Sequence, residues 1–419
     1  MLVYRHVIDR IKVWLGKEKI ILLTGPRQVG KTTILKILEG ELKRESKTLF
    51  FSCDLEIGNP LFKDPKLFIS LLEAELSANP KLNVFLDELQ YIPQAGLFLK
   101  PVFDRLKTSI QFFVSGSSSL EISRSREFLT GRKIEFRITP FTFPEWLGTA
   151  SQFSYPRSIS IEPLAEVSDF YQAHRSDLET HALTYLNWGG YPEPAFEPPE
   201  NKLQIIREII STYLQKDIAG FLNISNLEAF NNLIRLLAGQ AGSLVNRHEI
   251  SSTLRLNSQT LNKYLAILEG TYIFTLLPPF FTNVRREISK MKKAYVFDPG
   301  VRRVITNGRP SVSLDEVSGP DIENFIFTVL SNAPQFDSLH YYRTISKSEI
   351  DFVAQVEGAL VPVEVKFRVD YDRVPVSVRH FMKTYREKTK RAIVVTRDYL
   401  GKETDVYFIP FTVFPFLQI

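Results

Sequence analysis

The sequence predicts an α/β protein of three domains, and two patterns along the chain lead to this prediction. In residues 19–145, short apolar runs bounded by turn residues alternate with helical stretches, which is typical of a mostly parallel sheet covered on both faces. From about residue 318, a helix precedes several strand-like segments, which indicates a second α/β domain. The segment between them has mainly helical spacing. A chain of 419 residues has room for two or three domains of about 150 residues each.

The composition is that of a folded globular protein. Apolar residues make up 44% of the chain and charged residues 24%, which excludes disorder as the main state. The single cysteine, Cys53, excludes an internal disulfide and a zinc site built from several thiolates. No apolar run reaches the roughly 18 residues of a membrane-spanning helix, and the N-terminal segment is typical of an amphipathic helix. We therefore expect a cytoplasmic protein that does not enter a membrane.

Four apolar runs define the strands expected in the first domain, residues 1–150. The stretch at 31–40 has helical spacing and places Ile34, Leu35 and Leu38 on one stripe. Because the carboxyl ends of parallel strands meet at one edge of a sheet, residues that follow the runs are expected to lie close together. The four runs cover residues 19–24, 48–53, 82–87 and 110–115.

A phosphate-binding motif follows the first run. Residues 25–32 fit the pattern G-x-x-x-x-G-K-[ST] between a strand and a helix, which is the context that the motif requires. Backbone N–H groups and the helix N-terminus can surround phosphate oxygens there. We expect Lys31 to reach the β- and γ-phosphates of ATP, and Thr32 to place its hydroxyl on Mg²⁺. The predicted nucleotide-binding residues are Gly25, Pro26, Arg27, Gln28, Val29, Gly30, Lys31, Thr32, Thr33 and Asp87.

Two acids at the end of the run at 82–87 strengthen this prediction. Asp87 is expected to hold Mg²⁺, and Glu88 to orient and polarise the attacking water. The run at 110–115 brings Ser115 and Ser117 to the same edge of the sheet. Either serine could sense the γ-phosphate, or both could belong to an ordinary turn.

Arg132 follows a glycine and is a candidate arginine finger. Such a residue enters the site of a neighbouring copy and stabilises charge in the transition state. The alternative is a solvated surface arginine.

Together these motifs resemble a prokaryotic family of AAA+-like ATPases with a DUF4143-type C-terminal half. The resemblance implies an ATPase module, a winged-helix-like middle and a nuclease-like C-terminal fold. It also implies ring assembly, with a hexamer expected, and so favours Arg132 as a finger. The segments that carry it are GPRQVGKTT (25–33), FLDELQ (85–90), the strand followed by GSS, the LTGR to ITPFTFPEW stretch (129–146), YLNWGGYPE (185–193) and YLQKDI (213–218).

The middle domain, residues 151–310, is expected to contain a helix-turn-helix and a wing. The second helix would begin at Asn257 or Ser258, with Leu261, Leu265 and Leu268 inward. Residues 285–309 hold eight basic and two acidic side chains, a net charge of +6. DNA backbone binding, a solvated loop and a subunit contact are all open. The predicted DNA contacts are Lys263, Arg285, Arg286, Lys290, Lys292 and Lys293.

The C-terminal domain, residues 311–419, contains a D-x12-E-x-K pattern. Glu364 and Lys366 share one face of a strand, and Asp351 follows Ile350 in the apolar strand before it. Asp351 and Glu364 would hold Mg²⁺ or Mn²⁺, Lys366 would position the attacking water, and Glu323 is a further possible ligand. The pattern resembles the restriction-endonuclease-like (PD-(D/E)xK) superfamily. No proline precedes Asp351, however, and the alternative is an ion pair on a strand.

Three functions are compatible with these features. The favoured one is a DNA-dependent ATPase, a ring that moves on or remodels branched or forked DNA. A regulatory ATP switch that acts through protein or operator contacts is the second, and an ATP-regulated nuclease is the third. A second basic segment, residues 366–391, carries nine basic and three acidic side chains, which favours nucleic acid as a partner; the alternative is a solvated helix face.

Overall fold

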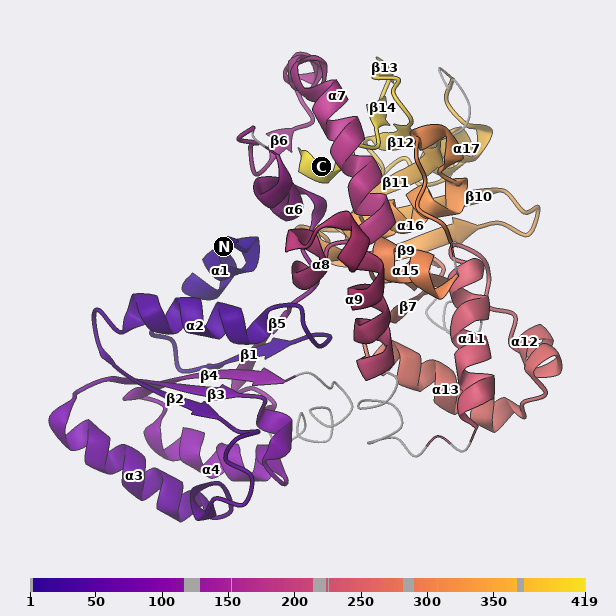
Figure 1. Cartoon of the computed structure of the whole chain (residues 1–419). Helices are drawn as coiled ribbons and strands as arrows, with labels where there is room; N and C mark the ends of the chain where they lie inside the picture. The colour runs from indigo at the N-terminus through magenta and orange to yellow at the C-terminus, as the bar shows by residue number, and fades with distance from the viewer. Residues whose placement is uncertain are drawn as a thin grey trace. The chain divides into compact units, whose positions relative to one another are not determined.

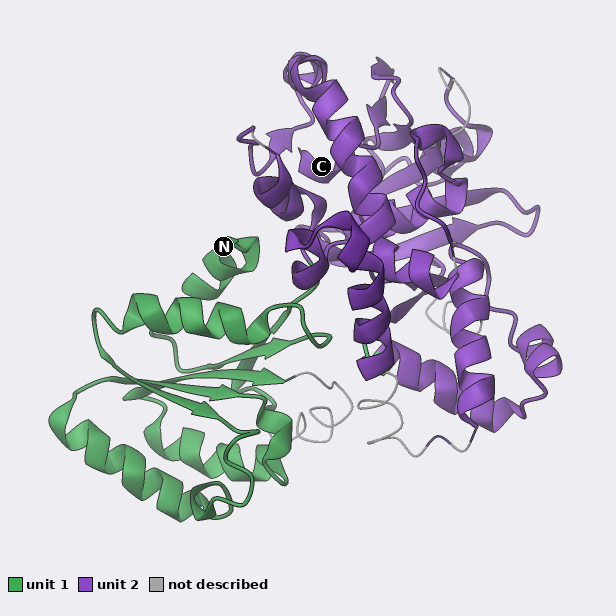
Figure 2. Ribbon diagram, in the orientation of Figure 1, with its two compact units in different colours: residues 1–140, 215–217, 270–272 green, residues 141–214, 218–269, 273–419 purple. Residues whose placement is uncertain are grey.

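The computed structural model divides the chain into two compact units (Figures 1 and 2). One is built mainly from Met1–Pro140 and the other mainly from Phe141–Ile419. The predicted boundary near residue 310 lies inside the second unit. The structure describes residues 3–116, 129–151, 153–213, 224, 226–281, 290–306, 308–367 and 373–419.

The first unit is a parallel sheet with helices on both faces, as the sequence predicted. Its strands lie in the order β2-β3-β4-β1-β5. Four of them match the predicted apolar runs to within one residue. The fifth was missed because its sequence, KIEFR, is charged and mostly not buried, as is common in a strand at a sheet edge. The strands are β1 (Ile20–Thr24), β2 (Lys47–Ser52), β3 (Leu82–Asp87), β4 (Ile110–Gly116) and β5 (Lys133–Arg137).

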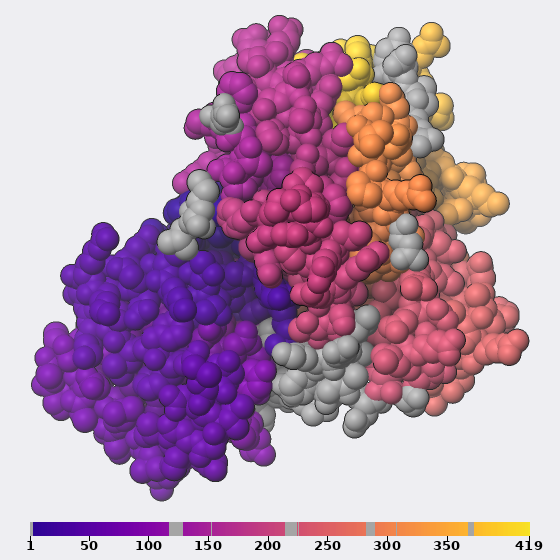
Figure 3. All heavy atoms as spheres, in the orientation of Figure 1, coloured from indigo at the N-terminus to yellow at the C-terminus, as the bar shows by residue number. Residues whose placement is uncertain are grey.

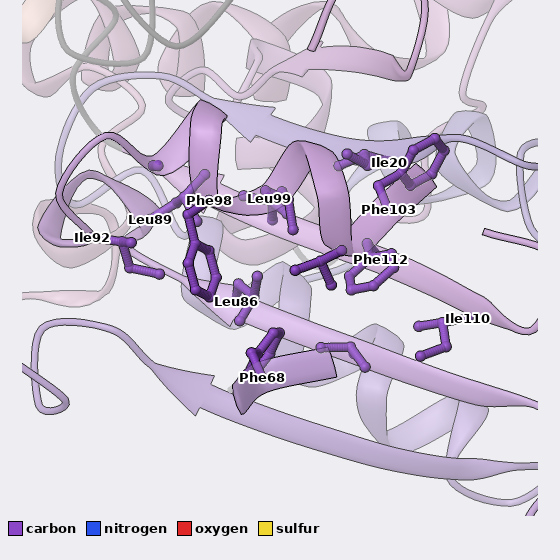
Figure 4. Packing of buried hydrophobic residues seen from close by; sticks show 14 of the residues in the cluster. Ile20, Phe68, Leu86, Leu89, Ile92, Phe98, Leu99, Phe103, Ile110 and Phe112 are labelled. Atoms are coloured by element: carbon purple, nitrogen blue, oxygen red, sulfur yellow. The ribbon is translucent and has the colours of Figure 1, made fainter. Parts of the chain in front are cut away.

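One face of this sheet is covered by two helices and holds a large apolar core (Figure 4). Phe68, Phe98 and Phe112 belong to this core, and the rings of Phe68 and Phe98 lie 5.5 Å apart. Burying a side chain of this size contributes roughly 1.5–3 kcal/mol. On the other face, Ile34, Leu35 and Leu38 are buried, as their spacing predicted. The helices are α1 (His6–Lys12), α2 (Lys31–Leu42), α3 (Pro65–Ala78) and α4 (Ala95–Leu106).

The first half of the second unit is mainly helical. Two of its strands form an antiparallel hairpin, and residues 242–245 bond to the second of these strands, because Gly242 N–H donates to Ala294 O over 2.9 Å. The helices are α6 (Phe143–Ala150), α7 (Leu164–Trp188), α8 (Pro192–Phe196), α9 (Pro199–Thr212), α11 (Leu227–Gly239), α12 (Arg247–Leu254), α13 (Ser258–Gly270) and α15 (Pro299–Ile305). The hairpin strands are β7 (Phe274–Leu277) and β8 (Lys293–Val296).

The C-terminal half of this unit is a mixed sheet of six strands in the order β13-β14-β12-β11-β10-β9. Neighbours β9, β10 and β11 run antiparallel, whereas β11, β12 and β14 run parallel. The strands are β9 (Ser338–Arg343), β10 (Glu349–Val356), β11 (Ala359–Lys366), β12 (Ala392–Thr396), β13 (Gly401–Glu403) and β14 (Val406–Pro410), with helices α16 (Gly319–Asn332) and α17 (Val376–Thr384). Short β6 (Ile159–Ser160) pairs with β15 (Leu417–Gln418).

The glycine pair of the YLNWGGYPE segment closes a tight junction between α7 and α15. The buried carboxylate of Asp298 accepts from Gly190 N–H over 2.8 Å and from Val301 N–H over 2.9 Å. A side-chain carbon at Gly189, where φ is +74°, would lie 2.0 Å from Oδ1 of Asp298. Burial raises the pKa of Asp298 to about 6, against the effect of the N–H donors. This conspicuous motif is therefore explained by packing.

Replacing Gly189 by alanine should destabilise the second unit. The new methyl group would collide with Asp298, and the alanine backbone would have to adopt a positive φ. We expect a loss of about 3 kcal/mol in the free energy of unfolding. The measurement is the urea midpoint of tryptophan fluorescence. Gly148→Ala is the control, since its added carbon meets nothing within 4 Å inside α6, and it should be neutral or slightly stabilising. Equal midpoints for the two variants would contradict the packing argument.

Candidate nucleotide-binding site and carboxylate cluster

The predicted phosphate-binding loop leaves β1 and turns directly into α2. Gly25 has φ of +147°, and a side-chain carbon there would lie 2.0 Å from the carbonyl oxygen of Ile138. Gly30 has φ of +92° and immediately precedes the helix. Both glycines are thus needed for the shape of the loop. The sequence motif therefore has the strand–loop–helix context on which its interpretation depends.

Two cations lie against this loop. Lys31 is buried, and its ammonium group donates to the carbonyl oxygens of Gly25 (3.1 Å) and Pro26 (2.7 Å). Arg5 is also buried and donates to the carbonyl oxygens of Val29 (3.0 Å) and Thr139 (2.7 Å). The role of Arg5 was missed, because only its position inside an apolar N-terminal stretch set it apart. Positive charge on this side of the loop favours an anionic ligand.

Two hydroxyl side chains, one from helix α2 and one from strand β4, converge on the carboxylate at the end of β3. Asp87, 2% exposed, ends β3, and its Oδ2 accepts from the hydroxyl of Thr32 over 2.7 Å. Its other oxygen accepts from the buried hydroxyl of Ser115 at the end of β4. A hydroxyl and a carboxylate in contact are oxygen ligands of the kind that Mg²⁺ prefers, so these residues fit the ion expected with ATP.

Ser115 therefore holds Asp87 in place in this structure. Its predicted role in sensing the γ-phosphate remains a prediction. Ser117, the other candidate sensor, lies outside the described residues. Thr33, at the third position of α2, is exposed.

Glu88 lies next to Asp87 in an unusual backbone conformation. Its φ of +56° is left-handed, which is uncommon for a residue with a side chain and often marks a functional position. Its N–H donates to the Ser115 hydroxyl over 3.0 Å, and its carboxylate accepts from the side-chain amide of Gln90. Ser115 thus links the two adjacent acids through separate hydrogen bonds.

Arg132 lies at the opposite edge of the same sheet. Its carbonyl oxygen accepts from Ile20 N–H over 2.8 Å at the start of β1, whereas the phosphate-binding loop follows Thr24 at the end of that strand. The two ends of the strand are about 13 Å apart. The guanidinium pairs with Asp104 through bonds of 2.7 and 2.9 Å. Arg132 is thus remote from the loop of its own unit.

The residues of the predicted nuclease-like site come together in the second unit. Asp351 on β10 and Glu364 on β11 are interlocked, because Asp351 N–H donates to Glu364 over 3.2 Å and Val365 N–H donates to Asp351 over 2.9 Å. Lys366 pairs with Glu364, as expected for residues on one face of a strand. Burial and the charge of Asp351 raise the pKa values of Glu323 and Glu364 to about 7.

Lys293 corrects one prediction at this cluster. It is 2% exposed, and its ammonium nitrogen lies 3.3 Å from Glu323 and 3.6 Å from Asp351, in contact also with Glu349. A buried lysine paired with three acids is not available to DNA phosphates. The same contact means that the carboxylates do not fit a divalent cation as they stand. Within the described ranges, no set of three acidic, histidine or cysteine residues is arranged to hold a metal ion.

The other predicted DNA contacts divide between exposed and unplaced residues. Asn257 caps α13 by accepting from Thr260 N–H over 2.8 Å, and Lys263 on that helix is exposed, as predicted. Helices α12 and α13 contribute to the surface in Figure 3. Lys290 is exposed, whereas Lys292 lies 3.7 Å from Glu269. Arg285 and Arg286 lie outside the described residues.

The two basic segments differ in how much positive charge they expose. In the first, Arg302 and Arg303 turn toward Asp321, and Arg302 is buried. In the second, most basic side chains on α17 and the turn after it are exposed. They are Arg379, Lys383, Arg386, Lys388 and Lys390.

The order of the parallel strands, the loop after β1 and the acids after β3 define the first unit as a P-loop ATPase domain. Comparison with protein families agrees: residues 17–147 match the AAA domain family. Residues 179–311 match a domain of unknown function, DUF8612, and residues 318–414 match another, DUF4143. The predicted AAA-type domain and DUF4143 segment are thus confirmed, and the AAA domain implies binding of ATP with Mg²⁺. The YLNWGGYPE segment falls in the DUF8612 match.

The chain is also similar to known proteins over most of its length. An uncharacterised protein of Mycobacterium tuberculosis is 24% identical over 372 residues, which are 86% of this chain and 73% of that protein. An uncharacterised protein of Haemophilus influenzae is 23% identical over 84% of this chain and 83% of its own. A solved structure of the replication initiator DnaA, bound to AMPPCP and single-stranded DNA, has a TM-score of 0.30 and 14% identity, covering 64% of this chain and 90% of that one.

In the part of the chain that the structure describes, no helix combines the length and the apolar character of a membrane span.

Proposed function

We propose that this protein is a DNA-dependent ATPase, a ring, expected to be a hexamer, that uses ATP hydrolysis to move on or remodel branched or forked DNA. The observation that carries the ATPase part is the hydrogen-bonded group formed by Thr32, Asp87 and Ser115 beside Lys31. Each residue comes from a different part of the sheet edge, and the group has the residue types that phosphoryl transfer requires.

The chemistry divides among these residues in a simple way. When ATP binds, Lys31 would exchange its loop carbonyl partners for phosphate oxygens, and Thr32 and Asp87 would hold the cation. Mg²⁺, when bound with ATP, neutralises charge on the β- and γ-phosphates. Glu88, fixed by the N–H bond to Ser115, orients the attacking water. Ser115 is a positioning residue for both acids.

The location of Arg132 supports a role between copies of the chain. Since it lies a full strand length from the phosphate-binding loop of its own unit, its route to a nucleotide is through a neighbouring copy. Asp104 holds the guanidinium in an exposed, two-bond pair. Exposed pairs of this kind are weak, so a γ-phosphate could draw Arg132 away from Asp104.

The DNA part of the proposal is supported by the helix-turn-helix and by the exposed basic residues. Helices α12 and α13, the β7–β8 hairpin and the bonded segment 242–245 have an arrangement typical of a winged helix. The order of α16, β9–β11, α17 and β12 is typical of a nuclease-like core. The exposed cations on and after α17, with few nearby acids, suit a phosphate backbone. We assign this domain a gripping role.

Glu88→Gln should bind ATP normally and hydrolyse it at least about 100-fold more slowly, because the site stays assembled while the group that activates water is neutralised. Lys31→Ala should instead weaken nucleotide binding. Phosphate release and binding of a fluorescent ATP analogue separate the two effects. Normal hydrolysis by Glu88→Gln would show that another group activates the water.

Arg132→Ala should lower turnover by about 1,000-fold in the assembled ring, as expected for loss of an arginine finger. Mixing Arg132→Ala with Glu88→Gln protein should restore activity, since an intact Arg132 then lies beside an intact Glu88 in some interfaces. Arg105→Ala, which removes a neighbouring surface pair with Glu73, is the matched control and should leave turnover unchanged. A mixture no more active than its two components would argue against a finger acting between copies.

Forked DNA should stimulate ATP turnover at low salt. The triple variant Lys383→Gln, Arg386→Gln, Lys388→Gln should weaken binding and lower the slope of log K against log salt by about 3, because three DNA phosphates are then no longer neutralised by the protein. The control changes three exposed lysines of the first unit, Lys63, Lys66 and Lys81, to glutamine. Turnover that neither duplex nor forked DNA alters would overturn the proposed function.

A further inference from the structure

The carboxylate cluster of the second unit already contains a cation. The side chains of Glu323, Glu349 and Asp351 come from a helix and a strand, and all three contact the ammonium group of Lys293. Lys293 comes from β8, outside the C-terminal sheet. An ammonium group among three carboxylates supplies positive charge at the place where a metal-dependent nuclease would hold its ion.

The strand that carries Lys293 is fixed firmly against the cluster. The side-chain amide of Asn324 accepts from Val296 N–H over 2.8 Å and donates to Val296 O over 2.9 Å. The Tyr295 hydroxyl donates to Glu323 over 2.6 Å, and its ring stacks on Phe327 with centroids 4.5 Å apart. These contacts fix the backbone of β8 and therefore the position of Lys293. The burial of Lys293 is thus part of the packing of this strand.

The surroundings leave little space for a hydrated ion. A side-chain carbon at Gly242 would lie 2.7 Å from Glu323 Oε1, so the protein backbone packs directly against that carboxylate. One oxygen of Asp351 accepts from Val365 N–H, and the other faces Lys293. The two oxygens of Glu364 accept from Asp351 N–H and from Lys366. The predicted metal ligands are thus satisfied by protein groups.

The charges of the cluster are close to balanced without a metal. Four carboxylates, Glu323, Glu349, Asp351 and Glu364, face three cations, Lys293, Lys366 and Arg343. Counted as ionised, these side chains sum to −1 (3 − 4), so an added divalent cation would change the sum to +1 and would be repelled by the ammonium group of Lys293 beside it. Because the ammonium group of Lys293 contacts Glu323, Glu349 and Asp351, a metal ion held by these three carboxylates would have to displace it.

We propose that Lys293 is the resident cation of this cluster and takes the place of a divalent metal, so that the domain does not use metal-dependent cleavage. The proposal rests on the nuclease-like interpretation of the domain given above. In this role, the ion pairs of Lys293 hold the β7–β8 hairpin against the C-terminal sheet. The domain then serves the ATPase by gripping DNA or by transmitting movement, while its carboxylates have a structural task.

The test measures Mn²⁺ binding to the whole, nucleotide-free protein, with electron paramagnetic resonance as the readout. Wild type and Asp351→Asn should bind Mn²⁺ equally, because no site in the wild-type protein depends on Asp351. Lys293→Met, which keeps the volume and removes the charge, should gain one site at least about 10-fold tighter than any in wild type, and the added change Asp351→Asn should abolish it. Lys402→Met, a matched surface change, should gain none.

Several results would overturn the proposal: Mn²⁺ binding by wild type that depends on Asp351, Mn²⁺-dependent DNA cleavage lost in Glu364→Ala, or folded Lys293→Met protein without a new site. If Lys293→Met does not fold, the comparison of wild type with Asp351→Asn decides the question. Because neither nucleotide nor DNA is present in the binding assay, its outcome is separate from failure of the proposed ATPase function.

Discussion

The parallel order of β3, β4 and β1 is the constraint on which the nucleotide site depends. Parallel strands need crossover helices, and their carboxyl ends then share one edge of the sheet. Asp87, Ser115 and the loop before Lys31 leave that edge from neighbouring strands. The hydrogen bonds from Thr32 and Ser115 to Asp87 follow from this order, since backbone pairing holds the ends of these neighbouring strands side by side. The same sheet separates Arg132 from the site by placing it at the amino edge.

Buried charge imposes the second constraint, and it acts differently in the two units. In the first unit, Lys31 lies against carbonyl oxygens, which are neutral and can be exchanged for phosphate. In the second unit, Lys293 faces carboxylates, whose attraction for an ammonium group is far stronger in a buried place. Burial by itself lowers the pKa of Lys293, but the surrounding carboxylates outweigh this effect and raise it. In the proposed function Lys31 can therefore turn to a phosphate, whereas Lys293 is already paired with carboxylates.

The sequence predicted those features that local pattern determines. The strands of the first sheet, the glycine positions of the loop and the buried face of α2 follow from apolar period and motif spacing, and these agree with the structure. It also placed Glu364 and Lys366 on one face, because alternation in a strand is local. β5 was missed because an edge strand need not be apolar. Arg5 and the burial of Lys293 could not be found, since both depend on contacts between residues far apart in the chain.

Net charge along a sequence is consequently a poor guide to the charge that a partner meets. The segments at 285–309 and 366–391 each have a net charge of +6, yet they are used in different ways. In the first, Lys293 and Arg302 neutralise acids inside the fold. In the second, the side chains on and after α17 remain exposed. Counterion release depends only on cations that can approach a phosphate. The second segment would therefore contribute more to DNA affinity than the first, although their net charges are equal. The proposed DNA surface of the C-terminal domain is therefore centred on α17, and the described part of the first segment mainly stabilises the fold.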